Sequence, residues 1–282
     1  MNCVETAQPS LPAALPANAC FAIVAPAGAA RLDTHKVSQW FVDRGYRCRI
    51  YPGALQAQGY LAGPDQQRLQ DLHDAFADPA IDAILCMRGG YGSMRLLDQL
   101  DFELIRHNPK PLIGYSDITA LHTAIYRHSG LVTFHGGMLN ADLLGAKLPP
   151  TESSLLAQLG GHVRTGEQIV HPADHALSSV LPGVASGPLL GGNLSMLGAS
   201  MGTLAEPGHP GLHPVHRGRQ RAVVPGGPAA DPVALGGQAG GDQGRAGGGL
   251  CRDYHSGVGA VAGGHLCAAG SAGVGGMAQW AL

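Results

Sequence analysis

Five short apolar segments alternate with amphipathic segments through the first 137 residues, and this alternation constrains the fold more than any other feature. The apolar segments read as buried strands, whereas the segments between them carry apolar residues three or four positions apart, as helices do. Parallel strands need crossover connections, usually helices, so the alternation predicts an α/β fold with a parallel, flavodoxin-like sheet. The predicted strands are 21–28, 47–51, 84–87, 111–114 and 132–134. The predicted helices are 34–44, 66–77, 93–100 and 118–127.

Three of the predicted strands end in polar or glycine-rich clusters, at residues 88–92, 115–117 and 135–137. The carboxyl ends of parallel strands lie at one edge of a sheet, and ligands bind there in open α/β folds. We therefore expect a functional site that brings the three clusters together.

Ser116 stands between a predicted strand and a predicted helix. A serine on such a turn can serve as a nucleophile, because nearby backbone N–H groups can stabilise an oxyanion. The local sequence GYSDI does not match the GxSxG elbow of the α/β-hydrolases. The alternative interpretation is that Ser116 and Asp117 merely cap the following helix.

The cluster Arg88-Gly89-Gly90-Tyr91-Gly92 has three interpretations. It matches neither GxGxxG nor GxxxxGK[ST], so a phosphate cradle or dinucleotide site has weak support. It can supply a glycine N–H to an oxyanion hole beside Ser116, or it is a flexible turn. Arg88 can bind a substrate carboxylate through two parallel hydrogen bonds.

Three histidines are candidate partners of Ser116, and Cys86 is a second candidate nucleophile. His135 follows a predicted strand and is a candidate base, although a structural role is more common there. We expect His122 and His128 to be surface or helix-end residues. We expect Cys86, within a buried strand, to be a core residue.

Composition changes sharply near Pro207. Residues 208–282 contain 21 of the 43 glycines and no Ile, Phe, Lys, Glu, Asn or Thr. Such a segment lacks both core-forming and solvated side chains, so it cannot bury enough apolar area to offset its chain entropy. We expect five regions: an N-terminal tail (1–20), the α/β lobe with the nucleophile (21–137), a connector (138–180), the start of a C-terminal lobe (181–207) and a disordered glycine-rich segment (208–282). Within 181–207, Asn193 or Ser195 is expected to cap a helix over 194–200.

Charge and cysteine usage exclude several classes of function. With 18 basic and 20 acidic side chains, the net charge of −2 argues against nucleic-acid or anionic-membrane partners held by bulk charge. No apolar run reaches the length of a membrane span, and the first 25 residues lack the basic start of a signal peptide. The six cysteines have no metal-site spacing, which favours a reduced, cytoplasmic setting.

Taken together, the strand ends resemble the family of L,D-carboxypeptidases, which comprises muramoyltetrapeptide carboxypeptidases and the related microcin self-immunity peptidases. The resemblance covers about residues 20–207. The matching segments are IVAPAG (23–28), MRGGYGS (87–93), LIGYSDIT (112–119), TFHG (133–136) and GGNL (191–194).

The resemblance implies a two-lobed serine peptidase with a Ser-His-Glu triad and no metal or cofactor. Ser116 would be the nucleophile, and the N–H groups near Gly90 and Asp117 would form the oxyanion hole. The implied reaction removes the terminal D-alanine from a murein tetrapeptide during cytoplasmic cell-wall recycling. A homodimer is also implied.

The family's acid and base lie in its C-terminal lobe, yet Glu206 is the last glutamate of this chain. A one-base shift offers an explanation. Residues 213–219, HPVHRGR, can be encoded by a sequence whose next reading frame gives Ile-Pro-Phe-Ile-Glu-Asp-Val, the segment expected to hold the acid. The agreement continues for almost 30 residues. We therefore interpret residues from about 208 onward as frame-shifted, and we expect reduced or absent activity. The alternatives are a non-catalytic peptide-binding remnant and a microcin self-immunity type of peptidase.

Overall fold

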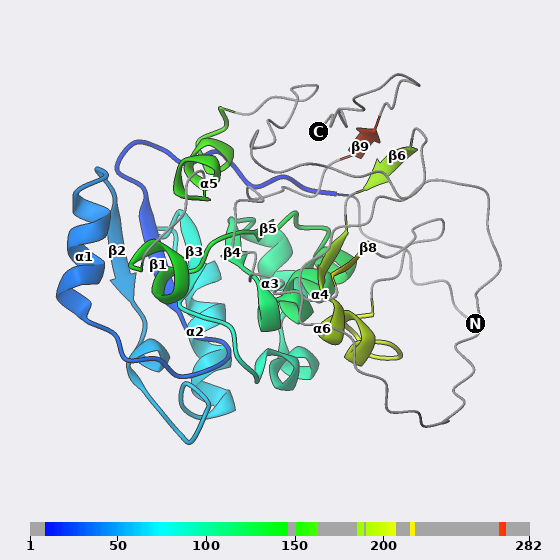
Figure 1. The fold of residues 1–282 in the computed structure, drawn as a ribbon, viewed down its shortest axis with the longest axis horizontal. Helices are drawn as coiled ribbons and strands as arrows, with labels where there is room; N and C mark the ends of the chain where they lie inside the picture. The colour runs from blue at the N-terminus through cyan, green and yellow to red at the C-terminus, as the bar shows by residue number, and fades with distance from the viewer. Residues whose placement is uncertain are drawn as a thin grey trace, which may run out of the picture.

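The computed structural model describes residues 9–145, 151–162, 185–188, 190–206, 215–217 and 265–268. Its main sheet has five parallel strands in the order β2-β1-β3-β4-β5, which confirms the predicted flavodoxin-like topology (Figure 1). The strands are β1 (Cys20–Val24), β2 (Arg47–Ile50), β3 (Ala83–Cys86), β4 (Leu112–Gly114) and β5 (Phe134–His135).

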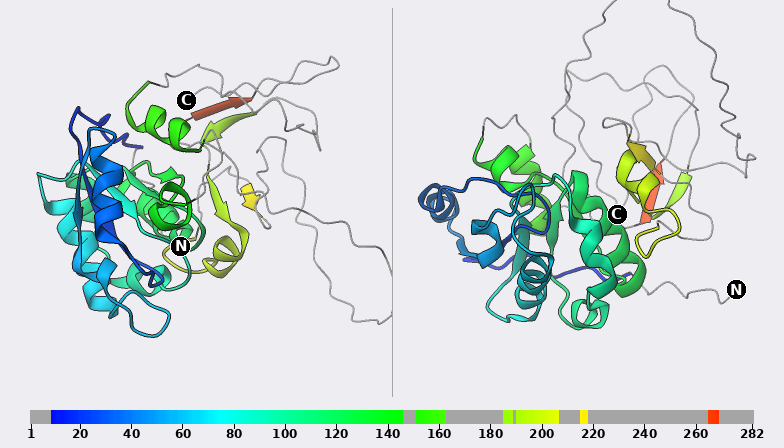
Figure 2. Two further views of the ribbon diagram at one scale, coloured as in Figure 1. Left: turned by 60° about the vertical axis from the view of Figure 1, so that its left-hand side comes forward. Right: turned by 90° about the horizontal axis from the view of Figure 1, so that it is seen from below.

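Helices cover both faces of this sheet (Figure 2). The α-helices are α1 (Thr34–Val42), α2 (Asp65–Ala77), α3 (Phe102–His107), α4 (Thr119–Ser129), α5 (Thr151–Leu159) and α6 (Leu194–Ala199). Shorter turns of helix are η1 (Pro52–Leu55), η2 (Ser93–Gln99), η3 (Ser116–Ile118) and the π-type turn η4 (Leu139–Leu143). The predicted helix at 93–100 is thus a 3-10 helix.

Alternate side chains of each central strand enter different cores. Ala22 and Val24 of β1 pack with α2, α3 and α4, whereas Phe21 and Ile23 pack with α1 and α5. Successive side chains of a strand point to opposite faces, so a strand covered on both faces is apolar at every position. This explains why the central strands β1 and β3 are continuous apolar runs in the sequence, whereas the edge strand β2 (RCRI) is not.

Two helices were not expected from the sequence. Helix α3 begins after Asp101, whose carboxylate accepts the N–H of Leu104 at 2.9 Å. Helix α5 lies within the segment expected to be a loose connector, and it buries Leu155 and Leu159 against the α1 face of the sheet. Both helices are short, with a single apolar turn that periodicity cannot separate from a loop.

The segment 190–206 docks on helix α4 through β7 (Gly191–Asn193) and α6. The backbone N–H of Asn193 donates to Oγ1 of Thr119 at 3.0 Å, and Arg127 donates to the carbonyl of Glu206 at 2.9 Å. Of the two residues expected to cap α6, it is Asn193 that does so, accepting the N–H of Met196 at 3.1 Å.

Two short strands lie in the glycine-rich region. Strand β8 (Val215–Arg217) pairs in parallel with β7, and β9 (His265–Ala268) pairs antiparallel with β6 (Ala185–Pro188). The rest of 208–282, together with residues 1–8 of the predicted tail and residues 146–150 and 163–180 of the predicted connector, lies outside the described residues. The frame shift, the disorder and the domain boundaries therefore stay predictions.

Candidate active site

Ser116 lies on the turn between β4 and α4, and its backbone has a φ of +61°. Among the described residues, only Asn18 is another non-glycine residue with positive φ. A left-handed conformation of this kind costs about 1–3 kcal/mol, and it persists where the surrounding structure imposes it. The half-buried serine hydroxyl is thereby presented at the carboxyl end of the sheet, in front of the first turn of helix.

Two glycines make this tight turn possible. A side chain on Gly114 would place its Cβ 2.9 Å from Cγ2 of Ile118, so the strand could not end against η3. A Cβ on Gly89 would lie 3.1 Å from Cβ of Ser116 and 3.4 Å from the backbone nitrogen of Asp117. The glycine-rich turn after β3 therefore packs directly against the serine turn after β4, as the sequence predicts.

Asp117 and Ser93 lock the two turns together. The backbone N–H of Ser93 donates to Oδ2 of Asp117 at 2.9 Å, and the Ser93 hydroxyl donates to the Asp117 carbonyl at 2.6 Å. Both residues are buried. Oδ1 of Asp117 has no hydrogen-bond partner in the described part of the chain. The Asp117 side chain thus fixes the approach of the two turns.

The backbone N–H groups predicted to bind an oxyanion lie on these two turns. Gly90 has a φ of +116°, and its turn is tied to the end of β1 by a 3.1 Å hydrogen bond from Gly28 N–H to the Gly89 carbonyl. Asp117 stands in the first turn of a helix, where backbone N–H groups have no acceptor within the helix. This arrangement can stabilise negative charge that develops beside Ser116.

Arg88 lies exposed above the same turns. Its Nη1 donates to the carbonyl of Ala29 at 2.8 Å, which holds the guanidinium over the end of β1. The remaining N–H groups of its fork are compatible with carboxylate binding. Nearby, the exposed rings of Tyr60 and Tyr91 meet edge to face, with centroids 5.6 Å apart.

The histidines differ from the sequence expectation in one case. His122 is not a surface residue: it is buried, and its Nε2 donates to the carbonyl of Gly114 at 2.9 Å. Burial lowers its pKa to about 4. The prediction was wrong because the helix that carries His122 is buried along nearly its whole length, which spacing alone did not reveal. His128 is half-buried in the last turn of α4, in keeping with a helix-end residue, and its Nε2 contacts the Leu204 carbonyl at 2.9 Å.

His135 stands at the end of β5, paired in register with Gly114. Its ring centroid lies 6.1 Å from that of Tyr115 and 6.2 Å from that of His122. The proposed Ser116–His135 pair stays a prediction. Cys86 is fully buried in β3, and burial raises the pKa of its thiol, in keeping with a core residue.

Sequence reasoning missed two polar residues that hold the site. Ser93 is the first residue after the glycine-rich turn, a position typical of a helix-initiating serine. Arg68 is fully buried beneath the turn, and its guanidinium donates to the carbonyls of Pro26 and Gly92. A sequence signal for Arg68 was available. Arg68 stands beside Leu69 and Leu72 on the buried face of α2, and an arginine in an apolar stripe needs buried hydrogen-bond partners.

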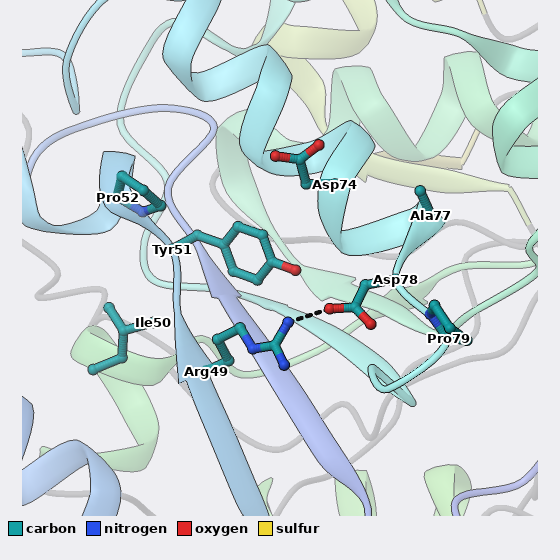
Figure 3. A pocket seen from close by; sticks show the side chains of 8 residues that line it. All are labelled: Arg49, Ile50, Tyr51, Pro52, Asp74, Ala77, Asp78 and Pro79. Atoms are coloured by element: carbon teal, nitrogen blue, oxygen red, sulfur yellow. Dashed lines mark hydrogen bonds and ion pairs between the residues drawn. The ribbon is translucent and has the colours of Figure 1, made fainter.

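A separate hollow of about 500 Å³ lies between the end of β2 and the end of α2. Figure 3 shows the Tyr51 ring inside it, beside the Arg49–Asp78 ion pair. None of the residues predicted for the site lines this hollow.

Within the part of the chain that the structure describes, no cluster of three His, Cys, Asp or Glu residues could hold a metal ion. No helix of that part is long and apolar enough to cross a membrane.

Comparison with known proteins gives a consistent picture. Residues 21–136 match the family described as the LD-carboxypeptidase N-terminal domain. A probable murein peptide carboxypeptidase of Bacillus subtilis is 40% identical over 185 residues, which is 64% of this chain and 56% of that protein. The murein tetrapeptide carboxypeptidase of Pseudomonas aeruginosa is 42% identical over 158 residues, 55% of this chain and 49% of that protein.

Among solved structures, the microcin C7 self-immunity protein MccF superimposes with a TM-score of 0.59 at 26% identity, over 71% of this chain and 68% of that one. The chain thus spans about half the length of the curated relatives it matches. The matched segment carries the strand ends that meet at Ser116. Residues 21–136 of this chain are thus identified as an LD-carboxypeptidase N-terminal domain, and the curated proteins that match the chain are named as carboxypeptidases of murein peptides.

Proposed function

We propose that this chain descends from a serine-type L,D-carboxypeptidase. That enzyme removes the terminal D-alanine from murein tetrapeptide during cell-wall recycling in the cytoplasm. The observation that carries the proposal is the strained Ser116, held by Gly89 and by the Ser93–Asp117 pair at the carboxyl end of the sheet. The names of the B. subtilis and P. aeruginosa relatives support the substrate class.

In the proposed reaction, Oγ of Ser116 attacks the carbonyl carbon of the scissile amide and the D-alanine amine leaves; water then hydrolyses the acyl-serine ester, which releases the shortened peptide and restores the hydroxyl. The N–H groups of Gly90 and Asp117 stabilise the oxygen that becomes negatively charged. Arg88 binds the terminal carboxylate of the peptide. A base must take the serine proton and deliver it to the departing amine.

The activity of this particular chain depends on whether it contains that base and the acid that orients it. By the family resemblance, both come from a C-terminal lobe, and no glutamate follows Glu206. Loss of the partners of a catalytic serine lowers turnover by about 10⁴- to 10⁶-fold. We therefore propose that the 282-residue chain retains the nucleophile but has lost most of its activity.

The test measures D-alanine release from murein tetrapeptide by three proteins. They are the chain as it stands, its Ser116→Ala variant, and the protein translated from the same gene with the frame shifted by one base near codon 208. We expect release by the shifted-frame protein alone, and a fourth protein, the Ser116→Ala variant of the shifted-frame protein, should be inactive. Resequencing of codons 200–220 shows which frame the gene carries.

Two outcomes would contradict the proposal. Peptidase-level release by the chain as it stands would overturn the inactivity, and release that survives Ser116→Ala would overturn the nucleophile. Peptide binding without release by the chain as it stands would favour the binding-remnant alternative.

The likeness to MccF favours a second candidate, a peptidase of the microcin self-immunity type. Parallel assays of the shifted-frame protein on murein tetrapeptide and on a peptidyl nucleotide separate the two candidate functions. A higher kcat/KM for murein tetrapeptide favours the L,D-carboxypeptidase, and a higher kcat/KM for the peptidyl nucleotide favours the self-immunity type. We also propose a homodimer, which sedimentation of the shifted-frame protein tests.

A further inference from the structure

Arg68 is a charged side chain that is buried on the face of α2 that otherwise packs apolar residues against the sheet. It belongs to α2, and its side chain has no solvent exposure. Moving a guanidinium out of water costs several kcal/mol unless hydrogen bonds and an opposite charge compensate it. A residue of this kind is retained where its contacts position something else, so the atoms that it holds indicate its role.

The contacts of Arg68 join two strand-end turns. Nη1 donates to the carbonyl of Pro26, which follows β1, and to the carbonyl of Gly92 at 3.0 Å, which closes the turn after β3. Nη2 pairs with Oδ1 of Asp65, one turn earlier on α2. A single guanidinium therefore ties α2 to the turn after β1 and to the turn after β3, and the second of these turns packs against Ser116.

The fit of the turn around Arg68 leaves little space. Gly92 has a φ of +126°, and a Cβ there would lie 2.5 Å from Cδ2 of Leu61 and 3.0 Å from Nη1 of Arg68. The next residue, Ser93, makes the two hydrogen bonds to Asp117. A continuous series of contacts thus runs from Arg68 through Gly92 and Ser93 to the serine turn.

We propose that Arg68 is a positioning residue, which holds the 88–92 turn so that the Gly90 N–H faces the oxygen of the carbonyl group whose carbon Ser116 attacks. The inference rests on the proposed function for its catalytic consequence, whereas its structural consequence can be measured without turnover. Lysine cannot replace Arg68, because an ammonium lacks the planar fork that reaches two carbonyls and a carboxylate at once.

Arg95 provides a matched control. It also pairs with Asp65, with its Nε donating to Oδ2 at 2.8 Å, but its side chain is about half exposed. Arg95→Gln therefore removes an Asp65 contact of similar chemistry and leaves in place both carbonyl contacts of Arg68 and the backbone hydrogen bond from Arg95 N–H to the Gly92 carbonyl. Exposed ion pairs contribute little to stability.

The first experiment is hydrogen exchange on the 282-residue chain and on its Arg68→Lys and Arg95→Gln variants. We expect Arg68→Lys to speed exchange in peptides covering 86–96 by about tenfold, the equivalent of one charge-assisted hydrogen bond. Peptides covering α1 should not change, and Arg95→Gln should leave both regions as they are. Unchanged exchange at 86–96, or equal acceleration in every described segment, would overturn the proposal.

The second experiment measures turnover in the shifted-frame protein. Arg68→Lys should lower kcat by about 10²-fold, the effect of a small misplacement of catalytic groups, and leave KM unchanged. A rise in KM alone, or rescue of kcat by lysine, would indicate a different role. If the unmodified shifted-frame protein releases no D-alanine, the proposed function fails while the exchange experiment still decides the positioning of the turn.

Asp65→Asn guards against misfolding of the arginine variant. It leaves both carbonyl contacts of Arg68 in place and weakens the ion pairs of Asp65 with Arg68 and with Arg95, of which Arg95→Gln tests the second alone. We expect faster exchange in the same 86–96 peptides, by less than in Arg68→Lys. No local change in a folded Asp65→Asn protein, together with an unfolded Arg68→Lys protein, would count against positioning and for a purely structural role.

Discussion

At the scale of single residues, Ser116 combines backbone strain with the nucleophilic role proposed for its hydroxyl. A positive φ is unfavourable for a serine, whereas glycine adopts it freely. Gly89 and the Ser93–Asp117 hydrogen bonds keep the residue in this conformation. The backbone strain therefore lies at the residue whose hydroxyl the proposed reaction uses, as is common at active sites.

We expect Ser116→Gly to be more stable than Ser116→Ala by about 1 kcal/mol, because alanine keeps the left-handed strain that glycine relieves. Urea unfolding of both variants measures the difference. Both should be inactive in the shifted-frame protein. Equal stability would show that the turn carries no strain at this residue.

At the scale of elements, α4 connects the serine turn to the segment 190–206. Gly192 lies directly against Thr119, and a Cβ at Gly192 would overlap the Thr119 side chain. Gly198, by contrast, lies in α6 and has no heavy atom within 4 Å of a Cβ placed on it. The two glycines therefore provide a matched pair for testing whether this docking contributes to stability.

We expect Gly192→Ala to lower the free energy of unfolding by about 1–3 kcal/mol, the usual cost of overpacking. Gly198→Ala should be neutral or stabilising by up to about 1 kcal/mol, because alanine favours a helix. Denaturant unfolding followed by circular dichroism compares them. A neutral Gly192→Ala variant would mean that 190–206 does not dock on α4 in solution.

At the scale of the whole molecule, buried His122 links stability to pH. Its pKa falls from 6.5 to about 4 because burial disfavours the charged ring. Between these values the unfolded chain binds a proton that the folded chain does not. The contribution of His122 to stability is therefore complete above pH 6.5 and is lost as the pH falls through about 4.

We expect His122→Gln to flatten the pH dependence of stability between pH 4 and 6.5, by roughly 3 kcal/mol over that range. The glutamine amide can still donate to the Gly114 carbonyl. His73, whose pKa is also lowered chiefly by burial, is common to both proteins, so the difference isolates His122. Parallel stability curves would contradict a neutral, buried His122.

The sequence by itself determined the order of strands and helices, the sheet topology and the strand ends at Ser116, Gly90, Asp117 and Arg88. These follow from local hydrophobic periodicity, glycine placement and the rule that parallel strands end at a common edge. The change in composition near Pro207 is likewise a property of the sequence alone.

Only the tertiary structure decided the burial of His122, the partnership of Ser93 with Asp117 and the position of Arg68 beneath two turns. Each depends on residues 8 to 42 positions apart in the sequence that meet through packing of helices on the sheet. Local patterns carry the period of an element but not the neighbour that each polar side chain meets. Burial, and the hydrogen bonds it demands, are properties of the assembled layers.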